Sequence, residues 1–358
     1  GEATVSWKSQ IKGEYWNKIN KIIGTTDGGA VAVGWIYQES TNPTITTNGN
    51  KDALIIKYDS KGKIEWFKNY GGTDDDEFTD VAQADDGNFV GKGTTESTNS
   101  GFNGIDFIYV AAKDGNSVSQ LDYNVNYSGI FHGKVPDIAY YNGAIYTVNE
   151  LGMSVTISYD FPSTTSEIST RRSVGKNQLK FSGDALNITG EEYSDNHTFF
   201  TANFTGNVKI VTNNLTASGT SQDGVIVSGK FSEKAGMPLY NWHKVLSTSG
   251  NEEIAGVTTL SNGNVLVYGS YTTAMTVDSV SLPTPKGGYD VFLLELNPND
   301  GTAISGRTFG GTQDDMITSA VETSDGSLLI GGTFYSASID IDGDGTADIT
   351  KVNNSTGT

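Results

Sequence analysis

Short apolar runs separated by turn residues follow one another along the whole chain, and their order repeats. In the copy that begins at Lys51, the apolar run 53–56 precedes a turn at 58–62 and a second run that carries Trp66. Runs of this length, bounded by Gly, Asp and Ser, are typical of β-strands joined in hairpins. A glycine pair, an acidic pair and another hairpin, with the turn Asp85-Asp86-Gly87, follow at once. Each copy therefore predicts four short strands.

Weaker copies of this pattern fill the rest of the chain. In the fourth copy the polar stretch Glu192–Gln222 reads as a long inserted arm, and the sixth copy stops before its tryptophan strand. The segment Thr4–Gln10 places Trp7 as Trp66 is placed, so it can supply that strand. The predicted repeat units are 14–72, 73–130, 131–174, 175–250, 251–311, and 312–358 together with 1–13.

The repeat predicts an all-β chain folded as a single β-propeller domain, 1–358. Six units predict six four-stranded blades, with seven as the alternative count, and repeats that bury their faces against neighbours fold as one body. Strand exchange between the N- and C-terminal segments would close the ring and remove its free sheet edges. No stretch keeps a helical period for more than about two turns.

Charge and composition narrow the partners. The formal net charge is −19 and the sequence pI is about 4.4, which argues against nucleic acid and anionic membrane surfaces. No apolar run approaches the roughly 18 residues of a membrane span, so we expect no membrane insertion. The chain has no cysteine, and an acidic, repetitive β protein of this kind favours export. We expect a monomer located outside a bacterial cell or on its surface.

The motifs of the repeat resemble a known group of sequences. They are a glycine pair, an acidic pair, an Asp-Gly or Asn-Gly turn, a Val-x-Val-x-Gly strand, and Asp-x-x-x-x-Lys-Tyr-Asp before the tryptophan strand. This combination resembles the seven-bladed-propeller-associated (SBBP) and delta-60-type repeats of bacterial cell-surface and secreted β-propellers. The likeness is strong over residues 14–115 and 223–335 and faint over 131–215. It implies a fold and a surface location, and no particular chemistry.

One loop near the C-terminus has the spacing of a metal site. Oxygen donors recur there at every second position, and glycines 343 and 345 permit the tight turns that such a loop needs. We predict a structural Ca²⁺ site, and the alternative is a solvated acidic turn. Lys351 stands where an EF-hand has its bidentate Glu, which argues against a helix-loop-helix sensor. The predicted ligands are Asp340, Asp342, Asp344, Thr346 and Asp348.

Other chemistry-bearing residues recur with the repeat. The acidic residues at the start of each unit predict capping of backbone N–H groups, with a cation-attracting collar as the alternative. They are Glu14, Asp75, Asp76, Glu252, Glu253, Asp314 and Asp315. Trp7, Trp66 and Trp242 share one strand position, which predicts packing between blades rather than a carbohydrate platform. Trp16, Trp35 and Tyr37 fall outside the repeat and are the candidates for exposed stacking.

Catalytic motifs are weak. The three histidines, His132, His197 and His243, lie in different units and belong to no recognisable motif. We predict a non-catalytic extracellular binding or adhesion module for a glycan or protein ligand. The alternatives are a polysaccharide hydrolase or lyase that uses carboxylates at the propeller face, and a structural spacer. The expected recognition surface is formed by irregular connections, at Glu39–Asn50, Glu96–Gly104, Glu192–Gln222 and Tyr271–Gly288.

Overall fold

The fold is known from a computed structural model, which describes most of the chain. Its described residues are 4–11, 17–41, 43–83, 87–97, 105–121, 145–148, 154–157, 181–183, 186–194, 197–210, 213–218, 220–232 and 237–351. Within these ranges no helix combines the length and the apolar character that crossing a membrane would require. The residues form two compact units, which we describe separately. The N-terminal unit holds described residues 4–157 and 323–333, and the C-terminal unit holds 181–322 and 334–351.

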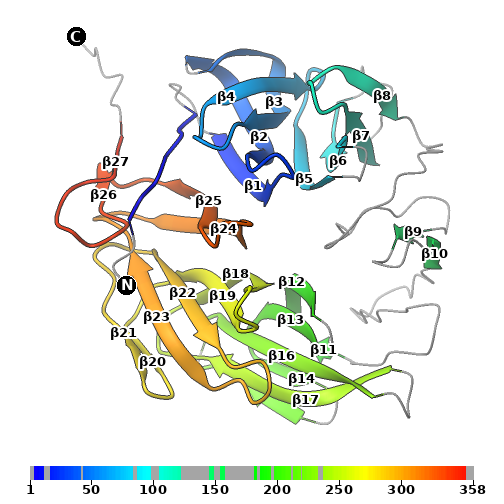
Figure 1. The fold of residues 1–358 in the computed structure, drawn as a ribbon. Coiled ribbons are helices and arrows are strands. Elements are labelled where there is room, and N and C mark those ends of the chain that lie inside the picture. Colours follow the sequence, from blue (N-terminus) through cyan, green and yellow to red (C-terminus); the bar gives the residue numbers. More distant parts are fainter. Residues whose placement is uncertain are drawn as a thin grey trace. The chain divides into compact units, whose positions relative to one another are not determined.

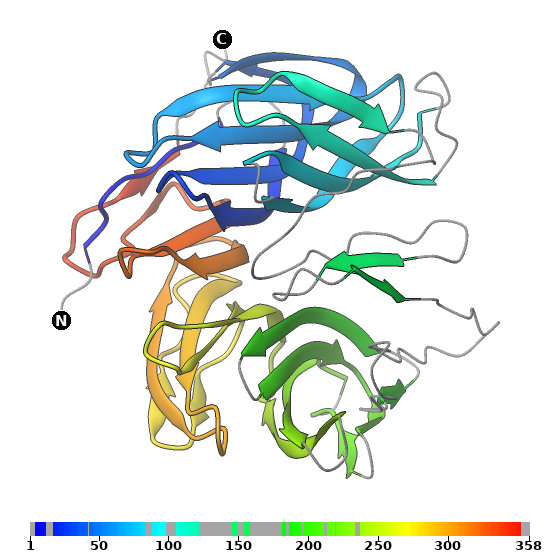
Figure 2. The same ribbon diagram turned by 45° about the vertical axis from the view of Figure 1, so that its right-hand side comes forward.

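Antiparallel four-stranded sheets recur along the chain, which confirms the predicted all-β class (Figures 1 and 2). The N-terminal unit contains two of them. Their strands are β1 (Asn17–Gly24), β2 (Ala30–Thr41), β3 (Thr44–Tyr58) and β4 (Ile64–Tyr70), then β5 (Asp76–Gln83), β6 (Phe89–Thr95), β7 (Ile105–Ala111) and β8 (Ser117–Leu121). In both sheets the strands lie side by side in chain order, as consecutive hairpins.

The C-terminal unit contains two further four-stranded sheets. One consists of β12 (Leu186–Ser194), β13 (His197–Phe204), β16 (Asp223–Ser232) and β17 (Met237–Leu246). The other consists of β18 (Glu252–Thr259), β19 (Val265–Tyr271), β22 (Asp290–Leu296) and β23 (Ala303–Phe309). The predicted repeat of four-stranded sheets is therefore present in both units. Closure into one ring, the number of blades and the single-domain boundary stay predictions.

The remaining strands are short or complete smaller sheets. Of the predicted third unit, 131–174, the described part is a pair of antiparallel strands, β9 (Ile145–Val148) and β10 (Ser154–Ile157). The others are β11 (Phe181–Gly183), β14 (Asn207–Ile210), β15 (Asn213–Thr216), β20 (Met275–Val277), β21 (Val280–Leu282), β24 (Asp315–Glu322), β25 (Leu328–Phe334), β26 (Ser338–Ile339) and β27 (Ile349–Thr350).

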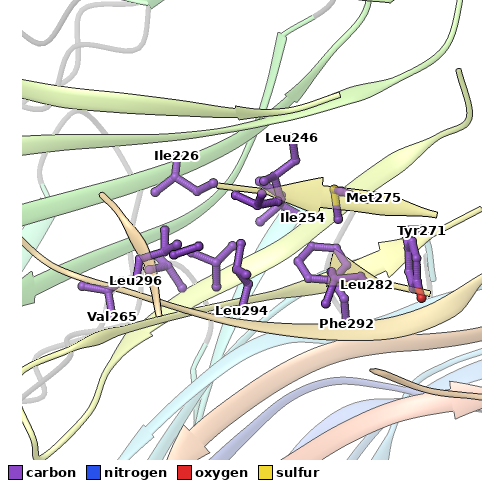
Figure 3. Close-up of a cluster of buried hydrophobic side chains, with 14 of the residues drawn as sticks. Ile226, Leu246, Ile254, Val265, Tyr271, Met275, Leu282, Phe292, Leu294 and Leu296 are labelled. Carbon is purple, nitrogen blue, oxygen red and sulfur yellow. The ribbon is translucent and has the colours of Figure 1, made fainter. Parts of the chain in front are cut away.

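Each unit has a core that lies between neighbouring sheets. In the N-terminal unit, apolar side chains of β2 and β3 pack against those of β5 and β6, and Ile55, Phe78 and Phe89 are fully buried. In the C-terminal unit, β16 and β17 pack against β18, β19 and β22, with Ile226, Ile254 and Phe292 in the middle (Figure 3). Alternation along each strand supplies these faces, because every second side chain points to the same side.

A tryptophan and a turn glycine meet at three equivalent places. A Cβ added to Gly115 would lie 2.8 Å from the ring of Trp66, and one on Gly301 would lie 2.7 Å from the ring of Trp242. Both indole Nε1–H groups donate to a carbonyl of the same turn, at 3.0 Å and 2.9 Å. A Cβ added to Gly62 would likewise lie 2.2 Å from the ring of Trp7. These contacts support the prediction that the three tryptophans serve packing. Residues 4–11, which were expected to supply a tryptophan strand, form no strand, so Trp7 matches Trp66 only in its contact with a turn glycine.

The stretch Glu192–Gln222 is not an irregular arm, and that prediction was wrong. It contains β13, a central strand that pairs with β12 and β16 along its whole length. The hairpin β14–β15 follows and covers one face of that sheet, so that Phe200, Val208 and Ile210 are buried together. Threonine and asparagine between the apolar residues concealed the strand alternation in the sequence.

Two other expected recognition loops are also ordered hairpins. Glu39–Asn50 lies in the extended hairpin of β2 and β3, where Glu39 pairs with Thr46. Tyr271–Gly288 contains the paired strands β20 and β21, whose Met275 and Leu282 join the core (Figure 3). Ile45 is buried in the first hairpin, and Met275, Val277 and Leu282 are buried in the second. Most of the fourth stretch, Glu96–Gly104, lies outside the described residues.

Candidate metal site and junction carboxylates

The acidic loop Asp340–Asp348 joins β26 to β27, and Figure 1 shows it in red beside these two labels. Asp348 N–H donates to the carbonyl of Ile339 at 2.8 Å, and Lys351 N–H donates to that of Ala337 at 2.8 Å. These bonds continue the short ladder in which Ile339 faces Ile349. The loop is therefore the tip of a hairpin that follows the strand β25, as β20–β21 follows β19 in the preceding sheet.

Backbone N–H groups hold the carboxylates of this loop in place. Asp340 Oδ1 accepts from Gly343 N–H at 2.7 Å and Oδ2 accepts from Gly345 N–H at 2.9 Å. Asp348 Oδ2 accepts from Ile341 N–H at 2.8 Å. Gly343 and Gly345 have φ values of 81° and 90°, which only glycine adopts without strain.

Three carboxylates converge in this loop. One oxygen each from Asp340, Asp342 and Asp348 can be chosen so that all lie within 4.8 Å of one another, and all three residues are half-buried. Burial raises the pKa of Asp340, but the N–H groups of Gly345 and Gly343 and the charge of Lys286 outweigh it and hold that pKa below its usual value. The loop thus presents carboxylate oxygens, which are the ligands that hard cations prefer.

The structure brings together three of the five predicted ligands. Asp344 is exposed and accepts from Thr346 N–H at 2.7 Å, and it does not belong to the convergent group. Thr346 is exposed as well. The half-buried acidic cluster formed by Asp340, Asp342 and Asp348 could hold a metal ion. Participation of Asp344 and Thr346, and the identity of the ion, stay predictions.

The acidic residues at the start of the repeats cap backbone groups, as predicted. Asp76, Glu252 and Asp315 are buried, with 3%, 0% and 1% of their surface exposed. Each accepts a hydrogen bond from the backbone N–H four residues earlier, at 2.7–2.9 Å; the donors are Gly72, Thr248 and Gly311. Of their neighbours, Asp75 pairs with Lys51 at 3.3 Å and Asp314 accepts from Tyr289 N–H at 3.0 Å. Glu14 lies outside the described residues.

A second set of buried acids was missed. Asp52, Asp223 and Asp290 lie on third strands of their sheets, and each is at most 3% exposed. Each stands beside a first-strand acid of the next sheet. Burial raises the pKa of Asp52, Glu252 and Asp290, and the charge of the facing acid (Asp76, Asp223 and Asp315, respectively) adds to that effect. The sequence does show an Asp before each third strand, but not what it faces. We call the resulting pairs junction carboxylates: Asp52 with Asp76, Asp223 with Glu252, and Asp290 with Asp315.

The remaining candidates show little convergence. Trp35 is half-buried, and Lys51 Nζ lies 5.0 Å from the centre of its ring. His243 Nδ1 lies 2.7 Å from the hydroxyl of Tyr240 on the outer strand β17. Burial lowers the pKa of His243, and the same cause, together with Lys230, lowers that of His197. Trp16 and His132 lie outside the described residues.

Comparisons with known proteins give one distant relative. No family model matches the chain. The regulatory protein FlaEY of Caulobacter vibrioides is 26% identical over 328 residues, an alignment that covers 87% of this chain and 29% of FlaEY. The chain thus spans less than a third of the length of that curated relative. The resemblance to the SBBP and delta-60-type repeats stays a prediction.

Two solved structures match weakly. A protein of unknown function from Dyadobacter fermentans DSM 18053 has a TM-score of 0.43 and 12% identity, over 90% of this chain and 95% of that chain. A quinohemoprotein alcohol dehydrogenase from Pseudomonas putida HK5 has a TM-score of 0.36 and 9% identity, over 87% of this chain and 56% of that chain. At these scores neither likeness bears on the chemistry of this chain.

Proposed function

We propose that the chain is a closed β-propeller that acts as a non-catalytic binding or adhesion module outside a bacterial cell, with Ca²⁺ as a structural ion. The repeated four-stranded sheets and the seat of Trp7 on Gly62 support the propeller. The repeated carboxylates support a scaffold role, because they are used as acceptors for backbone N–H groups. The acidic charge of −19 supports an exported, soluble module.

The convergence of Asp340, Asp342 and Asp348 is the observation that carries the metal part of this proposal. Three carboxylates at this separation repel one another, and a divalent cation between them removes that cost. Oxygen donors on an irregular loop suit the larger Ca²⁺ better than Mg²⁺, which needs near-ideal octahedral geometry. The ion would tie the ends of the hairpin tip and fix its shape for a ligand.

Calorimetric titration with Ca²⁺ and with Mg²⁺ tests the site. We expect saturable Ca²⁺ binding at one site, and a gain in unfolding free energy of about 2.7 kcal/mol when Ca²⁺ is at 100 times its Kd. Asp342→Ala should abolish both effects. Asp325→Ala is the matched control, since Asp325 is an exposed turn acid that accepts from Ser327 N–H at 3.0 Å, outside the loop. Unchanged binding in Asp342→Ala would refute the assignment.

Glycan and extracellular-protein arrays test the binding role. The chain should bind a defined glycan or protein class, and chelation of Ca²⁺ should weaken that binding if the hairpin tip contributes to it. Turnover of a polysaccharide by the purified chain would instead support the hydrolase or lyase alternative. No binding to any array member would favour a structural spacer.

A regulatory role is the second candidate. The alignment with the regulatory protein FlaEY covers 87% of this chain, so the module can serve a similar role within a longer protein. Selective binding to one purified bacterial protein, without glycan binding, would favour this role over adhesion.

A further inference from the structure

Two junctions in the C-terminal unit bury pairs of acids in the same way. At the first, Glu252 N–H donates to the carbonyl of Gln222 at 2.8 Å, which sets Glu252 beside Asp223. Both of these acids are 0% exposed. Two carboxylates from adjoining sheets are thereby withdrawn from water side by side.

The second junction repeats this arrangement one sheet further on. Asp315 N–H donates to the carbonyl of Tyr289 at 2.7 Å, which sets Asp315 beside Asp290. Asp315 is 1% exposed and Asp290 is 3% exposed. The same backbone contact therefore places two buried carboxylates next to each other at both junctions, where their negative charges repel.

Neither pair is neutralised by a cationic side chain in the described part of the chain. The ion pairs found there involve other acids: Asp27, Glu65, Asp75 and Asp278. In addition, Asp223 Oδ1 and Asp290 Oδ1 are buried and have no hydrogen-bond partner among the described residues. A buried, ionised oxygen without a donor is costly, so each site calls for one more positive charge.

The N-terminal unit shows how the same position is satisfied elsewhere. There Asn69 Nδ2 donates to Asp52 Oδ2 at 2.7 Å. Asn69 lies on the outer strand β4, where it pairs with Leu54, two residues after Asp52. In the other two sheets, the outer-strand residue that pairs two places after the aspartate is Val245 or Thr308. Valine has no donor, and the hydroxyl of Thr308 bonds to Tyr271. The two junctions with an unpartnered oxygen are thus the two that lack the amide.

We propose that each of these two junctions binds one proton at neutral pH, shared within the pair Asp223–Glu252 and within the pair Asp290–Asp315. Binding converts one carboxylate of the pair into a carboxyl group, whose O–H donates a hydrogen bond, and release returns the proton to water. When a junction loses its proton, two negative charges face each other across it, and the free energy of unfolding of the C-terminal unit falls. The C-terminal unit should therefore be more stable toward unfolding in mildly acidic than in alkaline solution.

The surroundings favour a proton over a metal ion. A Cβ on Gly310 would lie 2.4 Å from Asp290 Oδ1, so backbone already occupies the space that a cation and its ligands would need. Other charged or titratable groups that face Asp290 are Lys286, which is exposed, and Tyr271 on β19. Tyr271 also pairs with Glu252 across β18 and β19. No cationic side chain among these is buried.

The titration behaviour of the acids agrees with this geometry. Burial, with Asp223 adding to it, raises the pKa of Glu252 to about 7. Burial also raises the pKa of Asp290, and Asp315 adds to that effect while Lys286 opposes it. A raised folded-state pKa means that the stabilisation is fully present below the unfolded value of 4.5 and is lost as pH rises through about 7.

Urea unfolding between pH 5 and pH 8 tests the proposal, with Glu252→Gln and Asp290→Asn compared with wild type. One site of this kind should raise the wild-type unfolding constant by roughly 50-fold across that window. Each variant should lose its share of that rise. His197 and His243 have lowered pKa values, so their contribution makes the protein more stable as pH rises. Dividing the unfolding constant of each variant by that of wild type at the same pH cancels this contribution.

Glu295→Gln is the matched control. Glu295 lies on β22, as Asp290 does, but three donors from Asn262, Asn264 and Ser305 hold its pKa below the usual value against the effect of burial. Its variant should keep the wild-type rise. Equal pH profiles for all three variants and wild type would overturn the proposal.

Infrared spectroscopy gives a readout that does not depend on stability. At pH 6, where ordinary carboxyl groups are ionised, wild type should retain the C=O band of protonated carboxyl groups, and Glu252→Gln should reduce it. Absence of that band in wild type would refute the proposal even if a variant fails to fold. A Ca²⁺-dependent rise in stability that Glu252→Gln abolishes would also refute it, since the junction would then hold a cation.

Discussion

Gly301 and Trp242 show, at the scale of single residues, how one contact is built into the repeat. Gly301 has a φ of 73°, and the indole ring packs directly on its Cα, so any side chain there meets two separate obstacles. Gly263 has a φ of 84°, in the same sheet, but a Cβ on it would meet nothing within 4 Å. The pair separates backbone strain from steric conflict.

Gly301→Ala should therefore cost more than Gly263→Ala. The left-handed backbone alone costs about 1–2 kcal/mol for an L-residue, which both variants pay. Overpacking against Trp242 should add about 1–3 kcal/mol in Gly301→Ala only. Chemical denaturation of both variants measures the difference. Equal losses of unfolding free energy would mean that the ring moves aside freely.

Lys57 is an unusual buried cation. Its side chain is 2% exposed and its Nζ lies 2.8 Å from Asp27 and 2.9 Å from Glu65. In the fifth predicted unit the corresponding strand position holds Glu295, which is surrounded by amide and hydroxyl donors. The side chain at this position is thus a cation in one repeat and an anion in the other. The cation is surrounded by carboxylates, and the anion is surrounded by hydrogen-bond donors.

Lys57→Met should shift the titration of Asp27. Burial raises the pKa of this carboxyl group, but hydrogen bonds from Lys57, Thr25 and Gly29 outweigh it and lower the pKa to about 2. The stabilisation from Asp27 is present above 3.8 and is lost as pH falls through about 2. Side-chain NMR should show the pKa rising toward 3.8 in Lys57→Met and staying low in Lys61→Met, which removes an exposed lysine.

At the scale of elements, the connections after the second strand of each sheet differ most between the repeats. β2 and β3 extend into one long hairpin, whereas β14–β15, β20–β21 and β26–β27 are separate small hairpins. Two of these, β14–β15 and β20–β21, bury apolar residues on one face. The third carries the acidic loop at its tip. The repeats thus differ mainly in the connection between the second and third strands, where a change does not disrupt the four-stranded sheet.

Ile210→Ala tests whether β14–β15 is a structural cover. Ile210 is 0% exposed and packs with Phe200 and Val227. Its truncation should cost about 2–5 kcal/mol of unfolding free energy, by lost burial and by the cavity left behind. Lys209→Ala, on the exposed face of the same strand, should change stability by no more than about 0.5 kcal/mol. Equal effects would mean that the hairpin is a free arm.

The sequence predicts the regular strands well because local and global preferences agree there. Apolar runs between Asp-Gly and Asn-Gly turns mark β5, β6, β18 and β19 directly. It fails at β13 and β14, where threonine, asparagine and lysine interrupt the apolar residues, although Val208 and Ile210 do alternate with polar neighbours. Such short alternating stretches look like polar loops until a partner strand is known.

The candidate site was predictable to the same limited degree. Oxygen donors at alternate positions of one loop are a local pattern, so Asp340, Asp342 and Asp348 could be selected from the sequence. Which of the donors converge depends on the backbone turns at Gly343 and Gly345, and Asp344 turns outward. The junction carboxylates are not local, because each pair joins two sheets.

At the scale of the whole molecule, the proposed closed propeller requires that the two compact units unfold together. Each has its own buried cluster, so two independent units would give two separate unfolding transitions. The proposed closed propeller makes the opposite demand, because opening one blade exposes the faces of its two neighbours. Cooperativity therefore distinguishes a ring from two linked bodies.

Differential scanning calorimetry should show one transition, with equal calorimetric and van't Hoff enthalpies. Ile210→Ala perturbs only the C-terminal unit, yet in a closed ring it should lower the single midpoint without splitting it. Near-UV circular dichroism, which reports the tryptophans of both units, should follow the same curve. Two transitions, of which Ile210→Ala shifts only one, would contradict the closed ring while leaving the sheets and the acidic loop as described.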